Sequence, residues 1–162
     1  MAKKTKKDYY FQEFIGGRSI YLLFYFFKNG QFSVFSQENF LQQYNGGSMI
    51  LSKSSNIHKF NISKKFAQLF IKLKFSGLIM VEVKYYKNKF YMIEANPRLW
   101  GPSQLILDSN MNLFECFAFE NNLITKKINQ KYKNDIWYFW SGGLIDNQKN
   151  QKKTSLAENF FI

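Results

Sequence analysis

The segment between Leu78 and Arg98 constrains the fold of this chain more than any other part of the sequence. Within it, residues 78–86 and 90–95 carry apolar side chains at every second position, which is typical of β-strands. The tripeptide Lys87-Asn88-Lys89 separates them, and Asn tolerates the left-handed backbone that a tight turn needs. The segment therefore predicts an antiparallel hairpin with a three-residue turn.

The apolar positions of this hairpin also predict its register. Both apolar faces point into one core if the cross-strand pairs are Val81–Ala95, Val83–Ile93 and Tyr85–Tyr91. This register places Glu82 directly opposite Glu94, with Asn96 one step further along the same face. Two carboxylates in such positions repel each other unless a cation lies between them, and oxygen ligands of this kind suit Mg²⁺. The pattern leaves two interpretations open, a Mg²⁺ site or two solvated carboxylates.

The rest of the sequence predicts further strands and helices. Apolar residues 19–27 and 31–35 flank Asn29-Gly30, a strong turn signal, and predict a second hairpin. Residues 36–55 are polar and predict a loop or an irregular edge of the sheet. Three helices are expected, at 62–76, 103–107 and 112–120, with a last strand at 136–140.

The first of these helices has an amphipathic pattern. Its apolar side chains recur at helical spacing and are expected to face the sheet: Phe66, Leu69, Phe70 and Leu73. Asn61 or Ser63 is expected to cap its start, and Gly77 to end it.

Together these elements predict one α+β domain, a mostly antiparallel sheet with helices packed on one face. The domain is expected to span residues 9–145, between a basic flexible arm at 1–8 and a polar tail at 146–162. A chain of 162 residues can bury the core of a single domain, and 20% aromatic residues exclude a disordered chain.

Composition also limits the classes of function. The net charge of +12 leaves two interpretations open, a basic surface that binds nucleic acid or a lysine-rich composition without a binding role, and the second is favoured because Lys is spread along the chain. No apolar run reaches the roughly 18 residues that span a bilayer, and no secretory signal is recognised. We expect a cytoplasmic protein without a membrane partner.

Several single residues are expected to be structural. Cys116 is the only cysteine, so an intrachain disulfide is excluded, and its apolar neighbours predict burial. His58 is the only histidine and carries no catalytic signature around it. Trp100, Trp137 and Trp140 are expected to anchor the core.

The sequence Ile93-Glu94-Ala95-Asn96-Pro97-Arg98, preceded by Glu82, resembles the metal-binding hairpin of ATP-grasp enzymes. The resemblance implies that Glu82, Glu94 and Asn96 bind Mg²⁺, or Mn²⁺ in its place, on the phosphates of ATP. It also implies that Arg98 is a catalytic residue, with a structural salt bridge as the alternative.

A second stretch, Gln12-Glu13-Phe14-Ile15-Gly16-Gly17, resembles the ATP-grasp hinge strand. The resemblance implies that Gln12, Phe14 and Ile15 hold the adenine and that Ser19 lies beside the ribose. Met80 and Met92 are expected to complete the nucleotide site. Because the first half of the module is expected to be missing, Met80, Met92 and Phe14 should be solvent-exposed.

The resemblance covers about residues 9–144 and implies the carboxyl-terminal half of an ATP-grasp module. The implied function is ATP and Mg²⁺ binding within a ligase, at family level an ATP-dependent carboxylate–amine or carboxylate–thiol ligase that forms an acyl phosphate. A partner chain or an upstream segment is expected to supply the first half. Two alternatives remain open, a degenerate non-catalytic module and a basic aromatic nucleic-acid-binding domain.

Overall fold

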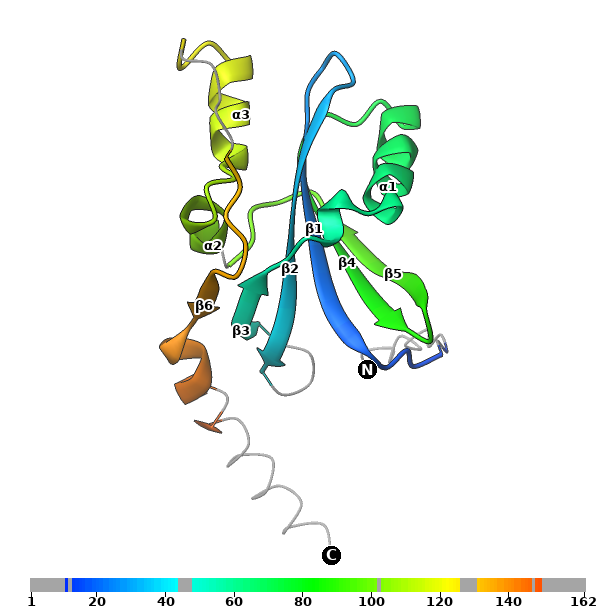
Figure 1. Cartoon of the computed structure of the whole chain (residues 1–162), viewed down its shortest axis with the longest axis vertical. Helices are drawn as coiled ribbons and strands as arrows, with labels where there is room; N and C mark the ends of the chain where they lie inside the picture. Colours follow the sequence, from blue (N-terminus) through cyan, green and yellow to red (C-terminus); the bar gives the residue numbers. More distant parts are fainter. Residues whose placement is uncertain are drawn as a thin grey trace, which may run out of the picture.

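The computed structural model describes residues 11, 13–43, 48–101, 103–125, 131–146 and 148–149. The predicted arm at residues 1–8, most of the predicted tail, and Gln12 lie outside the described residues. The described chain forms a six-stranded sheet in the order β5-β4-β1-β2-β3-β6, and every neighbouring pair is antiparallel. The predicted α+β class with a mostly antiparallel sheet is confirmed (Figure 1).

The elements follow the chain in a simple order. The strands are β1 (Arg18–Phe26), β2 (Phe32–Gln42), β3 (Met49–Ser54), β4 (Gly77–Tyr86), β5 (Lys89–Asn96) and β6 (Trp137–Phe139). The helices are the short 3-10 helix η2 (Ile57–Lys59), α1 (Asn61–Lys72), α2 (Ser103–Asp108) and α3 (Leu113–Glu120), and residues 141–146 are also helical. None of the helices in the described part of the chain has the length and apolarity that a membrane span requires.

Strand β1 lies in the middle of the sheet and is buried on both faces from Ser19 to Phe26. Its even-numbered apolar residues, Ile20 to Phe26, pack in one cluster with α1, including Phe70. Tyr21, Leu23 and Tyr25 pack in a second cluster with α2 and α3. The prediction that all helices cover one face is therefore wrong, because a continuous apolar strand needs cover on both faces.

Of the two alternatives for residues 36–55, the loop is wrong over most of its length, since β2 continues to Gln42 and β3 follows at Met49–Ser54. The pairing of these two strands is irregular between Asn39 and Gln42. These strands carry polar side chains that are buried and that bond to one another. Gln37 donates from Nε2 to Oδ1 of Asn39 at 2.8 Å, and Ser36 donates from Oγ to the Ser55 carbonyl at 2.8 Å. Such pairing lowers the cost of burying polar groups.

Helix α1 occupies the predicted place but differs in its ends. Phe60 is the N-cap and no side chain caps the helix, so the predicted capping by Asn61 or Ser63 is wrong. The helix ends at Lys72, Lys74 takes the left-handed conformation with φ 53°, and Gly77 begins β4 instead of ending the helix. Phe70 is buried as predicted, whereas Leu69 and Leu73 are exposed.

The β4–β5 hairpin keeps the predicted register at one end only. Val81 pairs with Ala95 and Glu82 with Glu94, but Val83 pairs with Met92 and Tyr85 with Phe90. The turn has two residues, Lys87 and Asn88, both with positive φ (47° and 61°), which suits the twist of a tight hairpin. A bulge before Glu94 takes up the extra residue, so the predicted pairs beyond Glu82 are wrong.

Candidate functional site

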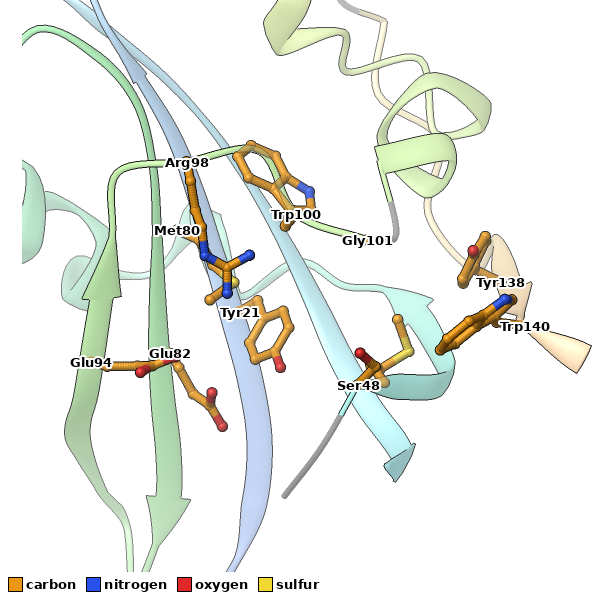
Figure 2. A pocket seen from close by; sticks show the side chains of 11 residues that line it. Tyr21, Ser48, Met80, Glu82, Glu94, Arg98, Trp100, Gly101, Tyr138 and Trp140 are labelled. Carbon is orange, nitrogen blue, oxygen red and sulfur yellow. The ribbon is translucent and has the colours of Figure 1, made fainter. Parts of the chain in front are cut away.

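A cavity of about 400 Å³ lies on the face of the sheet that carries α2 and α3. Tyr21 on β1 pairs with Glu82 on β4, and Glu82 pairs with Glu94 on β5, so the three residues form one row across the sheet. All three line the cavity, together with Met80 and Arg98 (Figure 2). The predicted juxtaposition of Glu82 and Glu94 is confirmed.

Neighbouring polar groups hold the two carboxylates in place. Ser19 donates from Oγ to Oε1 of Glu82 at 3.5 Å, and the amide Nδ2 of Asn96 donates to Oε1 of Glu94. Glu82 is half-buried and Glu94 is exposed at the edge strand. The arrangement gathers two carboxylates, one amide and one hydroxyl on one face of the sheet.

Burial disfavours the charged forms of Glu82 and Tyr21. It raises the pKa of Glu82, and Glu94 raises it further, against the opposing effects of Lys84 and the Ser19 hydrogen bond. Burial, with Glu82 next in effect, raises the pKa of Tyr21 to about 12, so its phenol is neutral at ordinary pH. A divalent cation would relieve the cost of two adjacent carboxylates.

The oxygen atoms gathered on this face are of the type that binds Mg²⁺. Among the described residues there is no group of three or more His, Cys, Asp and Glu side chains that could hold a metal. Mg²⁺ is commonly bound by only one or two carboxylates, with water and phosphate oxygens completing its shell. Glu82 and Glu94, with the amide oxygen of Asn96 as a further ligand, meet that requirement.

Arg98 lies two residues after the end of β5, and its backbone N–H donates to the Asn96 carbonyl at 2.9 Å. Its side chain lines the cavity and, among the described residues, donates only to the Leu99 carbonyl, at 3.3 Å. No carboxylate of the described residues forms an ion pair with it, which does not support the salt-bridge alternative.

The described residues of the predicted hinge and ribose contact are not part of the cavity wall, although Ser19 bonds to Glu82 behind it. Gln12 is outside the described residues, Phe14 is 92% exposed and Ile15 is half-buried. Ser19 is buried and accepts a hydrogen bond from Nδ2 of Asn39 at 3.2 Å. None of the described hinge residues lines the cavity.

The two predicted methionine contacts differ in outcome. Met80 lines the cavity but is only 4% exposed, so its predicted exposure is wrong; it packs in the α2–α3 cluster with Trp100. Met92 is exposed as predicted, but the bulge pairs it with Val83, which packs on the α1 side. Met92 therefore faces away from Glu94, and the structure does not bring it to the cavity as the predicted nucleotide contact requires.

Four aromatic residues at the cavity were not predicted as site residues: Tyr21, Trp100, Tyr138 and Trp140. Trp100 is buried as expected of a core anchor, whereas Trp140 is half-buried and Trp137 is 51% exposed. Cys116 is buried, as predicted. Only the alternation of β1 could have indicated Tyr21, because the other three depend on how distant segments meet.

Comparison with known proteins identifies the fold. No protein-family model and no curated protein sequence matches the chain. Biotin carboxylase from Campylobacter jejuni, solved as a β-γ-ATP complex, matches with a TM-score of 0.60 and 16% identity over 78% of this chain and 30% of that chain. Pyruvate carboxylase from Rhizobium etli matches with a TM-score of 0.58 and 14% identity over 74% of this chain and 12% of its own.

A third structure, the phosphoribosylaminoimidazole carboxylase ATPase subunit from Aquifex aeolicus, matches with a TM-score of 0.55 and 17% identity over 66% of this chain and 35% of its own. All three are ATP-grasp proteins, so the chain has an ATP-grasp fold, as the sequence predicts. It spans between 12% and 35% of the length of these proteins, which agrees with the prediction of a partial module.

Proposed function

We propose that this chain binds ATP and Mg²⁺, with the metal and the phosphates at the cavity, as part of an ATP-grasp ligase that activates a carboxylate as an acyl phosphate. The observation that carries the proposal is the row of Tyr21, Glu82 and Glu94 on the cavity wall, with Asn96 bonded to Glu94. The ATP-grasp fold of the chain supports it.

The metal ligands in this proposal are Glu82, Glu94 and Asn96. The raised pKa of Glu82 supports this role, because a cation restores the charged form that burial disfavours. When bound, Mg²⁺ neutralises charge on the phosphate oxygens during phosphoryl transfer, and Mn²⁺ offers the same chemistry. The carboxylates of Glu82 and Glu94 would hold the ion.

The nucleotide contacts in this proposal are Gln12, Phe14 and Ile15 for the adenine and Ser19 for the ribose. Phe14 is almost fully exposed, so its ring is available to a ligand. Met80 provides an apolar part of the cavity wall next to Glu82. Met92 is not included, because it does not line the cavity.

Arg98 is proposed to steady the transferred phosphoryl group. A substrate carboxylate oxygen attacks the γ-phosphorus, the bond from that phosphorus to the β–γ bridging oxygen breaks, and ADP leaves with its electron pair. An amine or thiol then attacks the acyl carbon and phosphate leaves. The first half of the ATP site is proposed to come from a partner chain or from an upstream segment.

The test is a calorimetric titration of ATP into the wild-type chain and Glu94→Gln, each with and without Mg²⁺. Weak ATP binding is expected, strengthened by Mg²⁺ in the wild type and unaffected by Mg²⁺ in the variant. Glu115→Gln is the matched control, because Glu115 lies on the exposed side of α3. Equal ATP affinity in all four conditions would exclude the metal role, and no ATP binding in any of them would favour a degenerate module.

A further inference from the structure

The two sides of the cavity differ in chemistry. Glu82 and Glu94 lie on the β4–β5 side, and Figure 2 shows Tyr138 and Trp140 on the opposite side, beyond Ser48. These two aromatic residues and Met49 of β3 provide an apolar surface with no charged group among them. A flat ring packs favourably on such a surface.

The position of Trp140 is fixed by the chain around it. Its backbone N–H donates to the Ile50 carbonyl at 2.8 Å, which anchors it to β3. A Cβ added at Gly142 would lie 2.9 Å from Nε1 of Trp140, and one added at Gly143 would overlap its six-membered ring. The two glycines therefore allow the backbone to pass close beneath the indole, and Gln43 donates from Nε2 to the Gly143 carbonyl at 3.2 Å.

The cavity also favours a ligand that carries a negatively charged group. Arg98 is the only cationic residue among the described residues that line the cavity. Trp100, on the same side of the cavity, is 5% exposed, and its indole N–H finds no acceptor among the described residues. Buried donors without a partner are uncommon in folded proteins. Both groups suit a ligand that carries a carboxylate.

We propose that the cavity binds a carboxylic acid that carries an aromatic ring, with its carboxylate at Arg98 and its ring on Tyr138 and Trp140. This proposal rests on the proposed function, because it identifies the aromatic acid with the carboxylate substrate that the ligase phosphorylates. The ring surface is available to it because the adenine is assigned to the hinge, none of whose described residues lines the cavity. Because Arg98 and Trp140 lie on opposite sides, the acid has a spacer between its two ends (Figure 2).

The experiment compares three probes without nucleotide: 4-phenylbutyrate, butyrate and 4-phenylbutylamine. Binding is followed by calorimetry in the wild-type chain, Trp140→Leu and Arg98→Gln. 4-Phenylbutyrate should bind at least about tenfold more tightly than butyrate, since a buried ring contributes more than 1.4 kcal/mol. Trp140→Leu should remove most of that preference, and Arg98→Gln should weaken both acids but not the amine.

Trp137→Leu is the matched control. Trp137 begins β6, which ends one residue before Trp140, but the Trp137 ring is exposed and contacts Phe40 and Lys53 instead of the cavity. This variant should bind 4-phenylbutyrate as the wild type does. If Trp140→Leu does not fold, Gly143→Ala displaces the indole with a smaller change and should reduce the same preference.

Titration of ATP with Mg²⁺ into the same variants separates the two proposals. Loss of ATP binding in Trp140→Leu, with 4-phenylbutyrate binding unchanged, would show that the indole stacks on adenine and would overturn the inference. Equal affinity of the wild type for 4-phenylbutyrate and butyrate would overturn it as well. Selective binding of 4-phenylbutyrate that Trp140→Leu removes, in a chain that binds no ATP, would support the aromatic acid site while contradicting the ATP-binding function.

Discussion

Glu82 of β4 lies directly opposite Glu94 of β5, and a bulge in the ladder makes this pairing possible. The two-residue turn pairs Tyr86 with Lys89 and Val83 with Met92. Without the extra residue of the bulge, that register would continue and place Glu94 opposite Val81, towards the α1 core. The bulge therefore turns the side chain of Glu94 to the cavity face of the sheet, next to Glu82.

The first prediction concerns the stability of this acid pair. Glu82→Gln should raise the free energy of unfolding at pH 7 by about 0.5 kcal/mol, because it removes a charge that burial disfavours and that Glu94 repels across the ladder. Since folding raises the pKa of Glu82, its stabilising contribution is present below the ordinary glutamate pKa and is lost as the pH rises through the folded-state pKa. The variant should therefore gain over the wild type at neutral pH and lose that gain in acid.

Urea denaturation at several values of pH between about 3.5 and 7.5 measures this difference. Glu115→Gln controls for the change in net charge. A gain that stays constant down to the lowest pH would contradict the assignment to Glu82. Addition of Mg²⁺ should stabilise the wild type more than Glu82→Gln, because the variant lacks one of the proposed ligands.

The second prediction concerns His58. Burial, with Lys59 next in effect, lowers its pKa to about 4, and its Nδ1 lies 2.9 Å from Oγ of the buried Ser36. A lowered pKa gives stability that is complete above the unfolded value of 6.5 and is lost as the pH falls through about 4. His58→Asn should therefore flatten the pH dependence of the free energy of unfolding between these values.

A nuclear magnetic resonance titration measures the pKa directly, since the chain has one histidine and gives one imidazole signal. Lys59→Gln should move the midpoint upward, because it removes a positive charge next to the ring. A wild-type midpoint near 6.5 would show that the imidazole is solvated instead of buried.

The sequence predicted the parts of the fold in which local pattern and tertiary packing agree. The alternation at 78–98 and the Asn29-Gly30 turn both identified real hairpins, and the Glu82–Glu94 pair followed from the first of them. The loop predicted at residues 36–55 was wrong because Ser36, Gln37 and Asn39 are buried and form hydrogen bonds inside the sheet. From composition alone, such polar residues are predicted to be solvent-exposed.

The cavity could be predicted only in part, for a geometric reason. One wall consists of neighbouring strands of the sheet, whose pairing leaves a pattern in the sequence. The opposite wall places Tyr138 and Trp140 across from Glu82, and no local periodicity relates segments so far apart in the chain. The turn of the β4–β5 hairpin was mispredicted because Lys is an unusual residue in left-handed backbone.

The third prediction concerns that turn. Lys87 has φ 47°, which is costly for a long side chain and less so for Asn. Lys87→Asn should therefore raise the free energy of unfolding by roughly 0.5 kcal/mol, given that a left-handed residue stores about 1 kcal/mol or more. Lys89→Asn is the control of equal charge, because Lys89 lies in β5, where Asn is disfavoured. Urea denaturation of both variants checks the prediction, and an equal change in the two would contradict it.

The last prediction concerns Gly17, which leads from the proposed hinge into β1. Its φ is 92°, and an added Cβ would overlap the Tyr85 carbonyl oxygen, which belongs to the backbone of β4. Gly17→Ala should therefore lower the free energy of unfolding by about 2 kcal/mol, because both the backbone conformation and the close contact must change. Gly16→Ala is the matched control, because a Cβ there meets nothing within 4 Å, and its effect should be under about 0.5 kcal/mol.

Denaturation in urea compares the stability of the two variants, and calorimetry with ATP then separates effects on stability from effects on binding. If residues 12–15 hold adenine, Gly17→Ala should weaken ATP binding under conditions in which the variant is still fully folded. Gly16→Ala should weaken ATP binding less than Gly17→Ala does. Unchanged ATP affinity in folded Gly17→Ala would place the adenine away from this segment.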